Sequence, residues 1–116
     1  MEIKILTEKM KMDEVRAFAE HWYGTMIKGT VDIAERKVAL GGDYHIESAE
    51  LLVQQGSKSE DVWGFNIRFE EDENGVLEFY SMVNIKPAHG NKSRSILDEH
   101  IAQSAEEVIR SWIDFI

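Results

Sequence analysis

Hydrophobic and polar residues alternate along the 116-residue chain with two different periods. A period of two, typical of strands with one packed face, predicts strands within residues 2–6, 28–33, 37–46, 61–69 and 76–87. A period near 3.6, typical of amphipathic helices, predicts helices within residues 12–24, 48–56 and 98–115. The predicted order of elements is therefore β-α-β-β-α-β-β-α.

The first and last predicted helices each carry an apolar stripe. In the first helix the stripe consists of Val15, Phe18, Ala19, Trp22 and Met26. In the last helix it consists of Ile101, Ala105, Val108, Trp112 and Phe115. Asp98 opens the last helix, and Gly24 offers a left-handed stop near the end of the first. The short middle helix is expected to be capped by Glu47 or Ser48 and closed by Gly56.

The strand segments pair by matching their apolar faces. In the first hairpin a turn at residues 35–36 sets Val31 opposite Leu40, and residues 37–46 form one strand that kinks at the two central glycines. In the second hairpin Ile67 pairs with Phe79, and the acidic residues 70–73 form a solvated tip. We expect one α+β domain over residues 1–116 with two layers, in which mainly antiparallel hairpins are covered by the first and last helices.

Composition narrows the class of protein. The net charge of −9 argues against nucleic acid and anionic membrane surfaces as partners. The chain has no cysteine, which excludes thiolate chemistry, and no apolar run approaches the ~18 residues that a membrane span needs. The N-terminal residues lack the features of a signal peptide, so a cytoplasmic protein is expected.

One candidate metal site lies where the long strand is expected to meet the middle helix. Asp43, His45 and Glu47 occupy alternate positions, which in a strand places the two carboxylates ~13 Å apart, too far to share one ion. A smaller ligand set would combine His45 with Asp32 or Asp43. The competing interpretation is a strand end whose polar residues meet water, a lysine and a helix cap.

A second candidate site is the segment 86–95, which is basic although the chain is acidic. It contains no acid and is long for a connector, which favours binding of an anion or phosphate. The candidate ligand-binding residues are Lys86, His89, Gly90, Asn91, Lys92, Ser93 and Arg94. The spacing is not that of a P-loop, and a flexible connector is the alternative.

A third group shares the polar face of the second hairpin. Its members are Asn66, Glu78, Tyr80 and Asn84. If this face adjoins His45, Asp32 and the basic segment, then their polar side chains line one pocket.

Three stretches of the sequence resemble a known family over nearly the whole chain: "VDIAERKVALGGDYH", "QGSKSEDVWGFNI" and "SMVNIKPAHGNKSR". The family consists of small bacterial proteins catalogued only as a domain of unknown function. The matching residues are Asp32, His45, Asp61, Trp63, Asn66, Ser81, Asn84, Lys86, Pro87, Gly90, Asn91 and Arg94. The chain departs from the family pattern at "IAERK". The resemblance implies a single domain and no particular activity.

Three functions are compatible with these patterns. The leading hypothesis is a binding or regulatory module for an anionic small molecule, a nucleotide or a protein partner. The first alternative is a metal-assisted hydrolase or nuclease centred on His45, in which the metal would polarise water. The second alternative is a structural protein that forms homodimers through a sheet edge.

Overall fold

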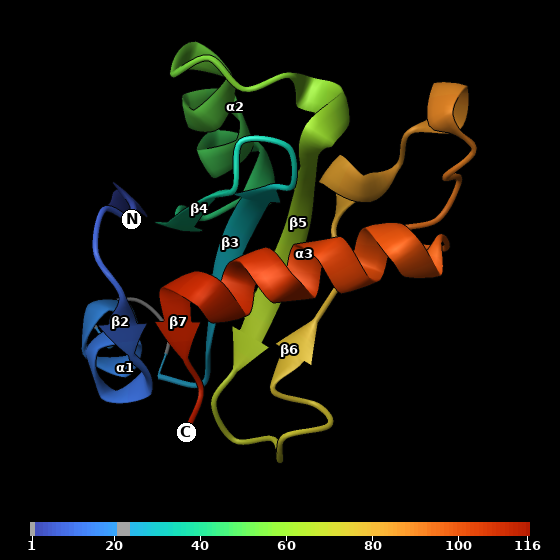
Figure 1. The fold of residues 1–116 in the computed structure, drawn as a ribbon. Helices are drawn as coiled ribbons and strands as arrows, with labels where there is room; N and C mark the ends of the chain where they lie inside the picture. The colour runs from blue at the N-terminus through green and yellow to red at the C-terminus, as the bar shows by residue number, and fades with distance from the viewer. Residues whose placement is uncertain (1, 21–23) are drawn as a thin grey trace.

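A five-stranded antiparallel sheet lies at the centre of the computed structural model, which describes residues 2–20 and 24–116 (Figure 1). Its strands follow the order β1-β4-β3-β5-β6. They are β1 (Ile3–Ile5), β3 (Met26–Asp32), β4 (Lys37–Gly41), β5 (Val62–Arg68) and β6 (Leu77–Glu78). Two further short strands, β2 (Met10–Lys11) and β7 (Ile113–Asp114), pair with each other in parallel.

Within the described residues, three α-helices pack on the sheet. They are α1 (Met12–Ala19), α2 (His45–Gln54) and α3 (Glu99–Trp112). The buried residues of α1 and α3 share one core with Trp63, Phe65 and Ile67 of β5, which confirms that the first and last helices cover this face. Figure 1 shows α3 crossing in front of β3 and β5. The α+β prediction is therefore confirmed.

The opposite face of the sheet, expected to be the wetter one, carries α2. Ala49 and Leu52 of this helix form a second apolar cluster with Ala39 of β4 and Val62 of β5. The sheet is thus covered on both sides. In the part of the chain that the structure describes, no helix has the length and apolarity that crossing a bilayer requires.

The first helix is shorter than its apolar stripe predicts. It ends at Ala19, and Met26 is the first residue of β3, so Met26 does not belong to the helix. Trp22 of the predicted stripe lies outside the described residues. The last helix agrees with the prediction, because the Asp98 carboxylate accepts bonds from the backbone amides of His100 and Ile101 and so caps α3. Phe115, however, lies beyond the helix end.

The β3–β4 hairpin has a longer turn than predicted. Val31 pairs with Val38, and Asp32 pairs with Lys37, which shifts the register by two residues from the expected Val31–Leu40 pair. The reason is the Asp32 side chain, whose Oδ1 accepts from the backbone amides of Ala34 (2.9 Å) and Glu35 (2.9 Å). A carboxylate that bonds its own turn in this way stabilises a loop of four residues rather than two.

The predicted strand over residues 37–46 is wrong beyond Gly41. Gly41 and Gly42 have φ values of 108° and 88°, a conformation that ends the strand. α2 then begins at His45, three residues before the predicted start. The Glu47 side chain accepts from the backbone amides of Asp43 and Tyr44 (both 2.8 Å) and so caps the N-terminus of α2, as in a capping box.

The second hairpin is also shorter than predicted. Ile67 pairs with Leu77 rather than Phe79, and β6 ends at Glu78. The chain then turns into a 3₁₀ helix, η2 (Met82–Asn84), in which the Ser81 hydroxyl accepts from the Val83 amide. The predicted strand over residues 79–85 is therefore wrong, and a cap at Ser81 explains why.

Candidate functional site

A polar network joins the start of α2 to the sheet. The His45 ring reaches β5, where Nε2 lies 3.0 Å from the Phe65 carbonyl oxygen and 2.8 Å from Asn66 Oδ1. Asn66 Nδ2 in turn donates to Glu78 Oε1 (3.0 Å) and to the Tyr80 carbonyl oxygen (3.1 Å). Because both neighbours of the His45 Nε2 atom are acceptors, this nitrogen carries the proton.

The environment of His45 favours the neutral ring. Burial lowers the pKa of His45, and the hydrogen bonds to Phe65 and Asn66 offset only part of that effect. Lys28 lowers the pKa further, whereas Glu78 raises it. A neutral ring that donates through Nε2 acts here as a link between α2 and β5.

A second polar joint ties η2 to the same strand. The buried Asn84 amide accepts from the Gly64 backbone nitrogen (2.7 Å) and donates to the Gly64 carbonyl oxygen (3.1 Å). It also donates to the Arg94 carbonyl oxygen (2.9 Å). The side chain of Asn84 thus takes the place that a neighbouring strand would have beside β5. Gly64 is required there, because a Cβ atom would lie 2.5 Å from Ser81 Cβ.

Strand parity correctly places Asn66 of β5 and its partner Glu78 of β6 on one face of the sheet. Asn84 lies beside β5 in η2, and His45 reaches Asn66 from α2. The polar atoms of these four residues mostly bind one another or the backbone. They hold elements together and do not line an open polar pocket.

The proposed metal ligands are not brought together. Asp32 is buried at the far end of β3, where Oδ2 accepts from the Ser57 hydroxyl (2.5 Å) and Oδ1 binds the turn amides. The Asp43 carbonyl oxygen accepts from Lys28 Nζ (2.7 Å). Among residues 2–20 and 24–116, no three His, Asp or Glu side chains are close enough to hold an ion.

The basic segment 86–95 is a folded loop whose polar groups bind within the protein. Asn91 is buried, and its amide nitrogen donates to the carbonyl oxygens of Asn84, Ser93 and Ser95. Lys86 Nζ donates to the Ser59 and Val83 carbonyl oxygens. Burial lowers the pKa of Lys86, and Asp61 partly offsets this.

The remaining members of the loop differ in how strongly they are engaged. His89 lies 3.6 Å from a Glu60 carboxylate oxygen, Gly90 adopts φ 79°, and the Ser93 hydroxyl bonds that of Ser95. Arg94 and Lys92 are exposed. Arg94 donates to Tyr80 Oη (3.2 Å) and Met82 Sδ (3.1 Å), which places a cation beside η2.

An apolar groove runs along the surface between α2 and η2. The α2 side is formed by Ile46, Ala49, Glu50 and Val53, at helical positions i, i+3, i+4 and i+7. The other side is formed by Met82, Val83, Ile85 and Lys86. The groove has a volume of about 530 Å³, and an adjoining hollow of about 360 Å³ shares Ile46, Met82 and Val83 with it and continues to Tyr44 and Lys28. We call the two together the α2–η2 groove.

Large apolar side chains are exposed around the α2–η2 groove. Met82 is 64% exposed, Ile46 53% and Val53 41%. Tyr44, Tyr80 and Ile85 are exposed beside them. Ile46 and Ile85 fall on the packed faces of the predicted strands, so the strand pattern does not indicate this surface. The available signal was that residues 45–54 hold more apolar side chains than one buried helix face needs.

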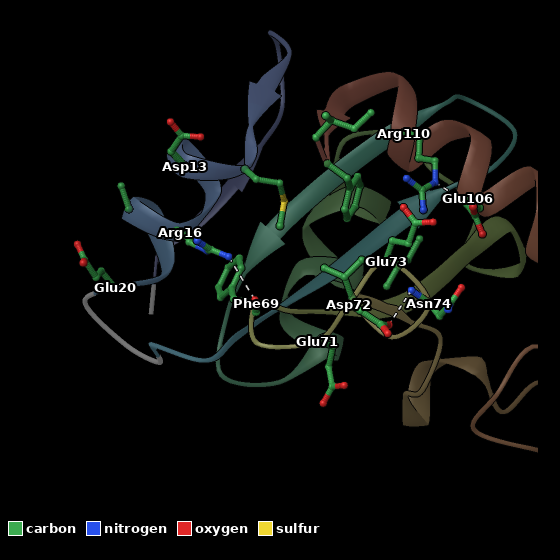
Figure 2. Close-up of a pocket in the computed structure, with 16 residues that line it drawn as sticks. Asp13, Arg16, Glu20, Phe69, Glu71, Asp72, Glu73, Asn74, Glu106 and Arg110 are labelled. Atoms are coloured by element: carbon green, nitrogen blue, oxygen red, sulfur yellow. Dashed lines mark hydrogen bonds and ion pairs between the residues drawn. The ribbon is translucent and has the colours of Figure 1, made fainter.

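A larger cleft of about 960 Å³ lies on another part of the molecule, between α1, the tip of the second hairpin and the C-terminal residues (Figure 2). Its carboxylates are Asp13, Glu20, Glu71, Asp72, Glu73 and Glu106. Both arginines in the cleft are engaged, since Arg16 donates to the Phe69 carbonyl oxygen and Arg110 pairs with Glu106. Figure 2 shows these bonds along the walls of the cleft. The cleft is therefore a solvated acidic surface, whereas the α2–η2 groove has two lysines and one glutamate in its walls.

Comparison with known families places the chain in one of them. The family model described as "Protein of unknown function (DUF5674)" matches residues 4–112. The chain therefore belongs to this family, which confirms the resemblance read from its sequence. No curated protein and no solved structure matches the chain.

Proposed function

We propose that this chain is a protein-binding module and that a segment of another protein occupies the α2–η2 groove. The observation that carries the proposal is the row of large apolar side chains held in water along α2 and η2. Met82 and Ile46 are each more than half exposed. Contiguous exposed apolar surface of this kind, with polar residues at its rim, marks interaction sites.

Binding would remove an energetic cost of the free protein. Taking a side chain of this size from full exposure to full burial is worth about 1.5–3 kcal/mol, and about half to two-thirds of that remains to be gained at Ile46 and Met82. Two or three such anchors provide the energy of a typical hot spot. Neither side chain belongs to a buried cluster, so folding of the monomer leaves more than half of each in water.

A protein segment fits this surface better than a small molecule or a second copy of the chain. Small-molecule sites are cavities that enclose most of the ligand, whereas the α2–η2 groove is bordered by half-exposed side chains along a helix. Two copies would each bring a net charge of −9 to the interface, which opposes self-association.

The basic segment has a supporting role in this proposal. The loop and η2 are fixed in place, and η2 is fixed to β5, by hydrogen bonds from the side chains of Asn91, Lys86 and Asn84. Their effect is to hold Met82 and Ile85 in position. The anion-binding version of the hypothesis would require these same groups to be free for a ligand.

A display experiment with random 12-residue peptides tests the proposal. The wild-type protein is the bait, and the selected peptides are then measured against an Ile46→Asp, Met82→Asp double variant. A Leu97→Asp variant is the matched control, because Leu97 is 59% exposed but lies outside the α2–η2 groove. We expect the double variant to bind at least about tenfold more weakly and the control to bind as the wild type does.

Two results would overturn the proposal. One is that no peptide is selected, or that the selected peptides bind the double variant and the wild type equally. The other is a wild-type dimer in light scattering that the double variant loses, which would assign the α2–η2 groove to a second copy. Circular dichroism melts of each variant verify that the fold is intact.

A further inference from the structure

The proposed function leaves open what kind of segment enters the groove, and we infer that it is an amphipathic helix with carboxylates at its ends. This inference rests on the proposed function and adds the conformation and the charge of the partner.

The first argument is the state of the backbone beside the groove. A partner in a strand conformation needs unpaired amides and carbonyls on the host. Next to the α2–η2 groove, Gly64 has both its backbone groups bonded to the Asn84 side chain. The amides of Val83, Asn84 and Ile85 each donate within their own turn. A helix satisfies its own backbone and so needs none of these groups.

The second argument is the match of lengths. The α2 wall of the groove runs from Ile46 to Val53, seven residues at a rise of 1.5 Å each, or about 10 Å. The anchors of a helical ligand at positions i and i+7 are also about 10 Å apart. Two turns of a partner helix therefore span the α2 wall. Met82 and Ile85 would contact the other side of that helix.

The third argument is charge. Lys86 lines the larger hollow of the α2–η2 groove and Lys28 the smaller one. Both already donate to backbone carbonyl oxygens, so they contribute positive charge to the groove and not free donors. Arg94 stands next to Met82, and its guanidinium has five donors, of which two are used in the contacts to Tyr80 and Met82. With Glu50 in the groove wall, three cations and one carboxylate stand at this surface of a chain whose overall charge is −9. Carboxylates at the ends of a partner helix would meet these cations.

The net charge of the protein favours peptides with lysine flanks, whereas the cations at the α2–η2 groove favour peptides with glutamate flanks. The order of the peptide affinities therefore tests the inferred charge of the partner. Three 16-residue peptides share leucines at positions i, i+3, i+4 and i+7 and differ in their flanks, which are glutamate, glutamine or lysine. A fourth peptide has glutamate flanks and a central proline that breaks the helix. Fluorescence anisotropy at low and moderate salt gives the four dissociation constants.

We expect the glutamate-flanked peptide to bind about three- to tenfold more tightly than the lysine-flanked one, from a few exposed ion pairs. We expect added salt to reduce this ratio and the proline peptide to bind most weakly. Arg94→Gln should lower the ratio about two- to fivefold. Arg110→Gln, the same change at an exposed arginine of α3, should leave it unchanged.

The outcomes separate the inference from the proposed function. The inference of an acidic helical partner is overturned if the lysine-flanked peptide binds more tightly than the glutamate-flanked one, or if the proline peptide binds as tightly as the glutamate-flanked one. Protein binding through the α2–η2 groove then still stands if Ile46→Asp with Met82→Asp abolishes that binding. If the peptides bind but none responds to the double variant, the proposed function fails as well. If none of the four peptides binds, the inference is overturned, and the display experiment alone decides the proposed function.

Discussion

Replacing Asn84 by alanine should remove the joint that holds η2 against β5. The Asn84 side chain is fully buried and makes three hydrogen bonds, two to Gly64 and one to the Arg94 carbonyl oxygen. The two backbone groups of Gly64 point away from β3 and would be left without a protein partner. An unsatisfied buried polar group costs about 1–3 kcal/mol, so the expected loss of unfolding free energy is about 2–5 kcal/mol.

Urea denaturation followed by circular dichroism measures this loss directly. Asn74→Ala is the matched control, because Asn74 is exposed at the tip of the second hairpin. It should change the free energy of unfolding by less than about 0.5 kcal/mol. If Asn84→Ala costs less than about 1 kcal/mol, water or a small rearrangement replaces its bonds, and the account of Asn84 as the joint of η2 is wrong.

Two further predictions concern His45 and the glycines. Because burial lowers the pKa of His45, the unfolded chain binds a proton at higher pH than the folded protein does. Stability conferred by the neutral ring should therefore be full above pH ~7.5 and fall as the pH drops through ~6.5, the usual histidine value. Urea melts of wild type and His45→Gln across this range should show a pH-dependent difference; parallel curves would refute the assignment. Gly41→Ala should destabilise far more than Gly56→Ala, since both have positive φ but only at Gly41 would a Cβ meet a backbone atom, the Glu2 oxygen at 2.1 Å. Thermal melts that rank the two glycine variants equally would contradict this.

Elements with strong local signals could be predicted, and pairings that depend on a turn could not. α3 follows from its apolar period and the Asp98 cap, both of which lie within one stretch of sequence. The apolar face of β5 follows from its alternation in the same way. The register of β3 with β4 depends on how the Asp32 carboxylate binds the turn amides, and a choice between two and four turn residues moves every pair by two.

The candidate site shows the same limit at a larger scale. Strand parity correctly places Asn66 and Glu78 on one face of the sheet, whereas His45 lies on α2 and Asn84 in η2, outside the strands that parity assumed. Parity says nothing about which polar atoms bind one another. The end of β6 at Glu78 was missed, so Ile85 was assigned to a packed strand face and not to an exposed surface.

Stability and binding should separate in this protein, because different side chains serve them. Asn84 and His45 fix η2 and α2 to β5 and contribute to the free energy of unfolding. Met82 and Ile46 are more than half exposed at the surface that these joints hold in place, so replacing them by aspartate removes less buried apolar area than the same change in the core would. If the same aspartates abolish peptide binding while the urea midpoint changes by little, the apolar surface is retained for a partner. If they instead lower the unfolding free energy as Asn84→Ala does, the two side chains belong to the core, and the proposed binding surface loses its physical basis.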